Sequence, residues 1–168
     1  MRKNAIWFVV VIAAALIQTT WLKPIRLFGV EPDLTVLLVV YFALKEGEER
    51  AMFTGALGGL FQDVASDAVL GHHVLCLVVA GYAVGRICKR LMTDHPAVKA
   101  ALVFGASLVG GLLFTAISYV QEPGTAAVNT VVARVVPGTF YTAIVTPLAF
   151  WFLDTLMRRF PAAQGGTG

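Results

Sequence analysis

Charge is scarce in this chain of 168 residues: only 14% of them are Asp, Glu, Lys or Arg, whereas 58% are hydrophobic. A water-soluble domain of this size could not cover so much apolar surface with so few charges, and the mean hydropathy of +0.78 agrees. The sequence therefore predicts an all-α, polytopic integral membrane protein. Nucleic-acid binding is excluded, because the basic residues are few and stand beside the ends of apolar segments.

Cysteine is equally scarce, with only Cys76 and Cys88 in the chain. Both fall in one predicted helix, where twelve positions separate them by about 18 Å along the axis. At that distance they cannot form a disulfide with each other, so they carry no information on the redox compartment. A cleavable signal is not expected either, because the apolar run after "MRKN" lacks a small-residue cleavage site.

Apolar segments near the length that a bilayer core requires, about 20 residues, occur about six times. The predicted helices cover residues 4–22, 34–45, 51–70, 72–91, 99–120 and 131–157. The second is short for a span, so we expect it either to begin at Pro32 or to be partly sheltered. Pro147 is expected to kink the last helix. We expect one transmembrane helical domain over 1–160 and a disordered tail over 161–168.

The distribution of the thirteen Lys and Arg residues predicts the orientation. With the N-terminus in the cytoplasm, only Lys23, Arg26 and Arg134 fall outside. The other ten then fall inside, and they are Arg2, Lys3, Lys45, Arg50, Arg86, Lys89, Arg90, Lys99, Arg158 and Arg159. The positive-inside rule favours this arrangement. Six spans and two cytoplasmic termini are therefore predicted.

Glycines recur at helix-packing spacing in the third and fourth segments. Gly55 with Gly59, and Gly81 with Gly85, form two G-x-x-x-G pairs. Such pairs let helix backbones approach closely where lipid supplies no hydrophobic driving force. They indicate either packing inside the bundle or a face that docks a partner. Both interpretations predict a tight contact between segments 51–70 and 72–91.

Two aspartates, Asp63 and Asp67, stand four residues apart on one face of the third segment, in the outer half of the membrane. A carboxylate near the bilayer centre costs at least about 2.5 kcal/mol, so we expect Asp63 to face inward and to be paired or protonated. Arg134 is the nearest basic residue by predicted depth. Asp67 can reach interfacial water, as can the adjacent His72 and His73.

An enzymatic interpretation rests on half of a motif. Arg50, Gly59, Asp63 and Asp67 reproduce the second half of the CDP-alcohol phosphotransferase pattern. The first half fails, because "FALKEGEE" precedes Arg50 and a two-metal site would lack its leading aspartates. A metal site built on the two histidines is also disfavoured by their spacing. With no nucleophile motif either, the sequence predicts no enzyme, no metal and no cofactor.

The order of these features resembles the MreD family of rod shape-determining membrane proteins. The similarity lies in "VEPDLTVLLVVYFALKEG" and "GALGGLFQDVASDAVLGHHVLCLVVAGYAVGR". Pro32 and Asp33 open the second helix, the glycine-rich third helix reaches Asp63, and Gly71 starts the fourth. The resemblance covers about residues 1–160 in length and hydropathy, and its motif region is roughly 30–90.

The resemblance implies a non-enzymatic scaffold of the bacterial inner membrane that binds the bitopic protein MreC. It also implies direct or indirect association with RodA, its partner transpeptidase and MreB, and so a role in cell shape and lateral peptidoglycan synthesis. The alternative is a small-molecule-binding subunit of an energy-coupling-factor transporter, since the helix count is similar. On the scaffold hypothesis, Asp63 fixes the third helix against the fourth and sixth, with Arg134 as its candidate partner. The glycine faces then present a groove to the partner helix.

Overall fold

The computed structural model describes residues 2–20, 32–65, 70–90, 95–121 and 127–159, and all regular secondary structure in these ranges is helical. The elements are α1 (Arg2–Thr20), α2 (Leu34–Glu46), α3 (Glu48–Ala65), α4 (His72–Cys88), α5 (Pro96–Gln121), α6 (Ala127–Thr130), the π-helix η2 (Val131–Val135) and α7 (Val136–Arg159). The predictions made for Lys23, Arg26, Asp67 and the tail 161–168 fall outside the described residues.

Each of the six predicted segments corresponds to a helix, and the last is built from α6, η2 and α7 in succession. Two helical stretches, Pro96–Gln121 and Val128–Arg159, are long and apolar enough to cross a membrane. Shorter apolar stretches occur at Asn4–Gln18 and His72–Cys88. The all-α fold class is therefore confirmed. Cys76 and Cys88 are both free thiols, as their spacing predicts.

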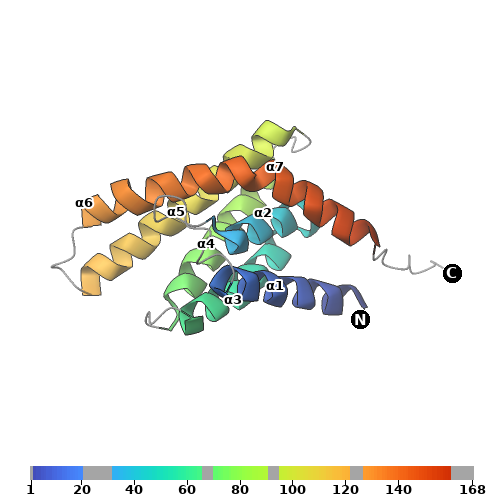
Figure 1. The fold of residues 1–168 in the computed structure, drawn as a ribbon, viewed down its shortest axis with the longest axis horizontal. Helices are drawn as coiled ribbons and strands as arrows, with labels where there is room; N and C mark the ends of the chain where they lie inside the picture. Colours follow the sequence, from blue (N-terminus) through green and yellow to red (C-terminus); the bar gives the residue numbers. More distant parts are fainter. Residues whose placement is uncertain (1, 21–31, 66–69, 91–94, 122–126, 160–168) are drawn as a thin grey trace.

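The short helix α2 lies at the centre of the bundle, where it contacts α1, α3, α4, α5 and α7 (Figure 1). Every residue from Thr35 to Ala43 is buried. Its 13 residues extend only about 20 Å at the usual rise per residue. Of the two explanations for its shortness, shelter by other helices is correct. A helical start at Pro32 is wrong, because α2 begins at Leu34 with Asp33 as its N-cap.

The helices pack in a compact order around α2. The closest association is between α3 and α4, which run as an antiparallel pair. The long helices α5 and α7 lie side by side, and Figure 1 shows α7 changing direction along its length. Pro147 is inside α7, where it removes one backbone hydrogen bond. The apolar core is formed by α2 together with side chains such as Val103 and Phe150.

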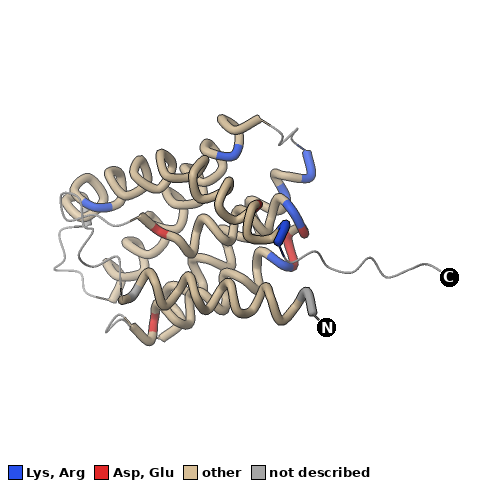
Figure 2. Tube along the Cα trace, turned by 45° about the vertical axis from the view of Figure 1, so that its right-hand side comes forward, with Lys and Arg blue, Asp and Glu red and all other residues tan. Residues whose placement is uncertain are grey.

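Charged residues gather at one end of the bundle, where α1 begins and α7 ends (Figure 2). Ion pairs join separate elements there: Lys45 Nζ lies 3.1 Å from Asp154 Oδ1, and Lys89 Nζ lies 2.9 Å from Glu48 Oε1. Gly47 makes the tight turn between α2 and α3 at this end, with a φ of 93° that favours glycine. The opposite end carries the acidic and polar residues that the sequence singles out.

Candidate functional site

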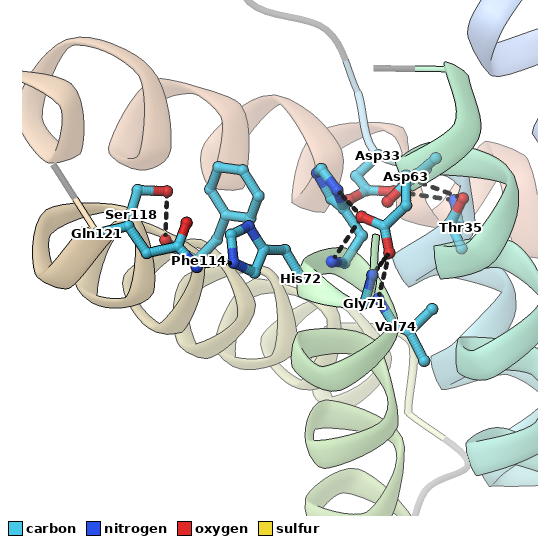
Figure 3. Close-up of polar contacts among 11 residues, drawn as sticks. Asp33, Thr35, Asp63, Gly71, His72, Val74, Phe114, Ser118 and Gln121 are labelled. Carbon is cyan, nitrogen blue, oxygen red and sulfur yellow. Dashed lines mark hydrogen bonds and ion pairs between the residues drawn. The ribbon is translucent and has the colours of Figure 1, made fainter. Parts of the chain in front are cut away.

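The carboxylate of Asp63, at the far end of α3, caps the N-terminus of α4. Its Oδ2 accepts hydrogen bonds from the backbone N–H groups of Gly71 at 2.8 Å and Val74 at 3.4 Å. Its Oδ1 accepts from the N–H of His73 at 2.9 Å and lies 2.8 Å from His73 Nδ1 (Figure 3). The first N–H groups of a helix have no partner within the helix, and a negative charge is favoured beside them. Asp63 therefore supplies the cap from a neighbouring helix.

Gly71 explains why the cap comes from α3. It is the N-cap residue of α4 and has no side chain to accept a hydrogen bond. Its φ of 104° lies in the left-handed region, where other residues are strained. The Asp63 side chain has no exposed surface, and within the described part of the chain its charge is compensated by these donors. One residue thus satisfies the end of α4 and joins it to α3.

The two adjacent histidines point to different neighbours. The ring of His73 lies against Asp63 on one side and 4.5 Å from the ring centroid of Phe114 in α5. His72 Nε2 lies 2.9 Å from Gln121 Nε2, also in α5. Figure 3 shows His72 directed toward Phe114 and Gln121. The start of α4 is therefore held by α3 and α5 together.

Arg134 does not pair with Asp63. It lies in η2, and it forms no ion pair with any residue in the part of the chain that the structure describes. The prediction that this arginine compensates Asp63 is wrong for a physical reason. The backbone N–H groups and imidazole of α4 already occupy both carboxylate oxygens. The guanidinium group of Arg134 is instead exposed and lines a cavity.

A second polar network surrounds Asp33 at the N-terminus of α2. Its Oδ1 accepts from the N–H groups of Thr35 and Val36, and from the side-chain amides of Gln18 in α1 and Gln62 in α3. The Asp33 N–H donates to Thr142 Oγ1 of α7 at 3.1 Å. Three helices thus converge on the cap of α2, and this network fixes the depth at which α2 begins.

These two networks border a cavity of about 440 Å³ between α2, α3, α4, α5 and the η2–α7 segment. Polar side chains line part of it, among them Asp33, Gln62, His73, Ser107, Arg134 and Thr142. A volume of this size falls in the range of ligand pockets. An acidic and a basic side chain on its walls give the cavity both signs of charge.

Both glycine pairs lie in the α3–α4 contact, where each faces the backbone of the other helix. A Cβ atom at Gly55 would lie 2.6 Å from the carbonyl oxygen of Leu77, and one at Gly59 would lie 2.6 Å from the Cα of Val74. Gly81 and Gly85 approach the backbone of α3 in the same way. The predicted tight contact is confirmed. The predicted partner groove on these faces is wrong, because α3 and α4 fill each other's small-residue surfaces.

Two residues of the phosphotransferase half-motif, Arg50 and Asp63, lie far apart in the structure. Arg50 lies in the first turn of α3 and donates hydrogen bonds to Glu46 Oε2 at 2.8 Å and to Asn4 Oδ1 at 2.7 Å, whereas Asp63 is near the other end of the helix. Thirteen residues of helix separate them by about 20 Å. Beside Arg50, the ammonium group of Lys89 donates a hydrogen bond to Glu48 and lowers the pKa of that carboxyl. These contacts are those of a structural charge cluster.

Several residues of the site escaped the sequence reasoning, namely Gln18, Thr35, Gln62, His73 as a partner of Asp63, and Thr142. A polar side chain inside an apolar segment is the one signal that marks them, since burial of an unpaired polar group is costly. Thr139, Thr142 and Thr146 show it most clearly, because they follow helical spacing on α7 and are all buried. That pattern indicates a polar stripe facing the bundle.

The geometry defines a class: an α-helical bundle with long apolar helices, buried polar caps and charges segregated at one end, as expected of a membrane protein. The chain belongs to the MreD family, and the model of that family, described as rod shape-determining protein MreD, matches residues 1–160. The family is one of membrane proteins with a role in rod shape determination, and it is not known as an enzyme family. Searches of curated proteins and of solved structures gave no significant match.

Proposed function

We propose that this protein is a six-span scaffold subunit of the machinery that maintains rod shape, with both termini in the cytoplasm of a bacterium. The family match over residues 1–160 is the observation that carries the proposal. The segregation of charge supports the orientation, because Lys45, Arg50, Lys89 and Arg158 stand at the helix ends that share one end of the bundle. A reporter fused to the C-terminus tests it: a fluorescent signal from a cytoplasm-only reporter is expected, and alkaline phosphatase activity contradicts it.

The proposed partner is an MreC-like bitopic protein. RodA, its partner transpeptidase and MreB are proposed to associate with the complex directly or indirectly. The scaffold role is supported by the structural function of the polar groups, since the carboxylate of Asp63 and the Asp33 network both tie helices together. The partner surface is not the face that carries Gly55, Gly59, Gly81 and Gly85, because α3 and α4 cover it mutually. It must therefore lie on another exposed apolar surface of the bundle.

Co-purification in a mild detergent tests this partner. A tagged copy of the full-length protein is expected to retain the MreC-like protein encoded in the same cell, at near-stoichiometric amounts. An unrelated bitopic membrane protein expressed at the same level is the control, and it is expected to be washed away. Equal recovery of both, or of neither, contradicts the proposal.

A second candidate function is small-molecule binding within a transport complex, and the cavity of about 440 Å³ favours it. A water-soluble ligand of such a subunit would raise the unfolding temperature of the purified protein, and a gene for an ATPase-coupled membrane subunit would stand nearby. The scaffold function predicts adjacent genes for MreB and MreC. It also predicts that no water-soluble ligand raises the unfolding temperature.

A further inference from the structure

The polar cavity, lined among others by Asp33, Ser107 and Arg134, lies beside an apolar groove of about 340 Å³ between α5 and the α6–η2 segment. Thr115 lines both spaces, so they meet at one side chain. The remaining groove residues are Leu112, Ala116, Tyr119, Val128, Val131 and Val132. A polar compartment joined to an apolar one matches the shape and chemistry of an amphiphile.

The polar cavity offers three groups that are not satisfied within the part of the protein that the structure describes. Arg134 has no ion pair there. Every hydrogen bond that described residues donate to the Asp33 carboxylate ends on Oδ1, which leaves Oδ2 without a donor. The Ser107 Oγ atom is buried and has no described hydrogen-bond partner. Buried polar atoms are normally paired, so the Ser107 hydroxyl indicates a missing partner, and the exposed Arg134 and the partly buried Asp33 present their charges to the same cavity.

The π-helix η2 directs residues into both compartments. Arg134 and Val135 line the polar cavity, whereas Val131 and Val132 line the apolar groove. A π-helical turn is rare and is found frequently at functional sites. Within five residues, this turn provides one cationic group for a headgroup and two apolar side chains for a hydrocarbon chain.

We propose that the cavity and groove bind one phospholipid with a zwitterionic headgroup. The phosphate pairs with Arg134 and accepts from the hydroxyl of Ser107, the ammonium group pairs with Oδ2 of Asp33, and an acyl chain occupies the groove. A purely anionic headgroup would leave the Asp33 carboxylate facing like charge, and a purely cationic one would do the same to Arg134. A ligand without a hydrocarbon chain would leave the groove empty. Phosphatidylethanolamine has all the required groups.

Native mass spectrometry of the delipidated full-length protein tests the proposal with phosphatidylethanolamine, phosphatidylglycerol and glycerophosphoethanolamine as probes. Phosphatidylethanolamine is expected to bind at least about tenfold more tightly than either of the others, since a charge-assisted pair or the acyl contact is lost in each. If glycerophosphoethanolamine binds as tightly as the lipid, the site is one for a water-soluble zwitterion. That result overturns the lipid assignment.

Single substitutions test what each lining residue contributes to lipid binding. Arg134→Gln changes an exposed side chain and is expected to weaken phosphatidylethanolamine binding about tenfold. The matched control is Arg90→Gln, an exposed arginine outside both compartments, with binding unchanged. Ala116→Leu, in the groove, is expected to weaken lipid binding without affecting the headgroup probe. Asp33→Asn retains the capping oxygen and should abolish the preference for phosphatidylethanolamine over phosphatidylglycerol. Equal binding of the two lipids to the unmodified protein, or no effect of Arg134→Gln, refutes the site.

Discussion

Asp63 Oδ1 and His73 Nδ1 lie 2.8 Å apart across the junction of α3 and α4. The same carboxylate also accepts from three backbone N–H groups of the first turn of α4. An acidic side chain of one helix therefore completes the hydrogen bonding of the next. The costly position of this charge in an apolar segment is explained by the number of donors that converge on it.

Replacement of Asp63 tests this capping role. Asp63→Leu removes the acceptor for all four donors, and we expect the free energy of unfolding to fall by at least about 2 kcal/mol, since unpaired buried donors cost about 1–3 kcal/mol each. Asp63→Asn keeps one oxygen but turns an amide toward a donor, so an intermediate loss is expected. Thermal unfolding in detergent measures the order. Equal stability of the Leu variant and the unmodified protein would show that the cap is dispensable.

The close α3–α4 contact predicts a strong difference between two Gly→Ala substitutions. In Gly59→Ala the new Cβ would lie 2.6 Å from the backbone of Val74, so α3 and α4 must move apart at a cost of about 1–3 kcal/mol. Gly105→Ala in α5 is the matched control, because nothing lies within 4 Å of its Cβ position. Its effect is expected to be neutral, or stabilising by up to about 1 kcal/mol. Similar losses for both variants in thermal unfolding would contradict the packing.

The link between α7 and the start of α2 depends on one hydroxyl group. Thr142→Val removes the acceptor of the Asp33 N–H at nearly constant volume, and we expect a loss of about 1–3 kcal/mol. Thr155→Val is the control, because the hydrogen bond described for the Thr155 hydroxyl goes to the carbonyl of Trp151 in its own helix. Thr155→Val should change the free energy of unfolding by no more than about 0.5 kcal/mol. The hypothesis fails if the two valine variants unfold at the same denaturant concentration or temperature.

Acid is expected to lower the stability of the folded protein by protonating Glu48 at the charged end of the bundle. The hydrogen bond from Lys89 lowers the pKa of this carboxyl in the folded protein, so the contribution of the pair is present above the pKa of the unfolded chain. It is lost as the pH falls through the lower, folded-state pKa. Lys89→Met is expected to flatten this part of the stability–pH profile below about pH 4.5. An unchanged acid slope in the variant would exclude the pair as its cause.

The lengths of the apolar segments were sufficient to predict the six helical segments from the sequence. The spacing of the glycine pairs likewise predicted the close α3–α4 contact, because both properties repeat locally along the chain. The partner of Asp63 was not predictable in this way. Its main donors are backbone N–H groups, which nearly every residue possesses, so no residue type marks them. Arg134 was predicted as the partner of Asp63 from its predicted depth in the membrane alone. That prediction did not consider backbone N–H groups as donors.

The polar cavity could not be predicted for a different reason. Its charged walls come from Asp33 and Arg134, which are about a hundred positions apart and meet only through the packing of α2 against α7. The π-helical turn that presents Arg134 has no sequence signature comparable to a cap or a proline. Such a site depends on the relative placement of several helices, which a local pattern does not contain.

The shortness of α2 has a consequence for the membrane itself. A helix of about 20 Å is roughly 10 Å shorter than the hydrocarbon layer of a bilayer. If the C-terminal, charged end of α2 lies at the cytoplasmic surface, its N-terminal end does not reach the opposite surface. The polar groups around Asp33 then lie inside the hydrocarbon layer. Across the centre of this protein the insulating layer is then thinner than in the surrounding lipid, and the transmembrane voltage falls over a shorter path. Charges at that position would experience a steeper electric field than they would in an unbroken bilayer.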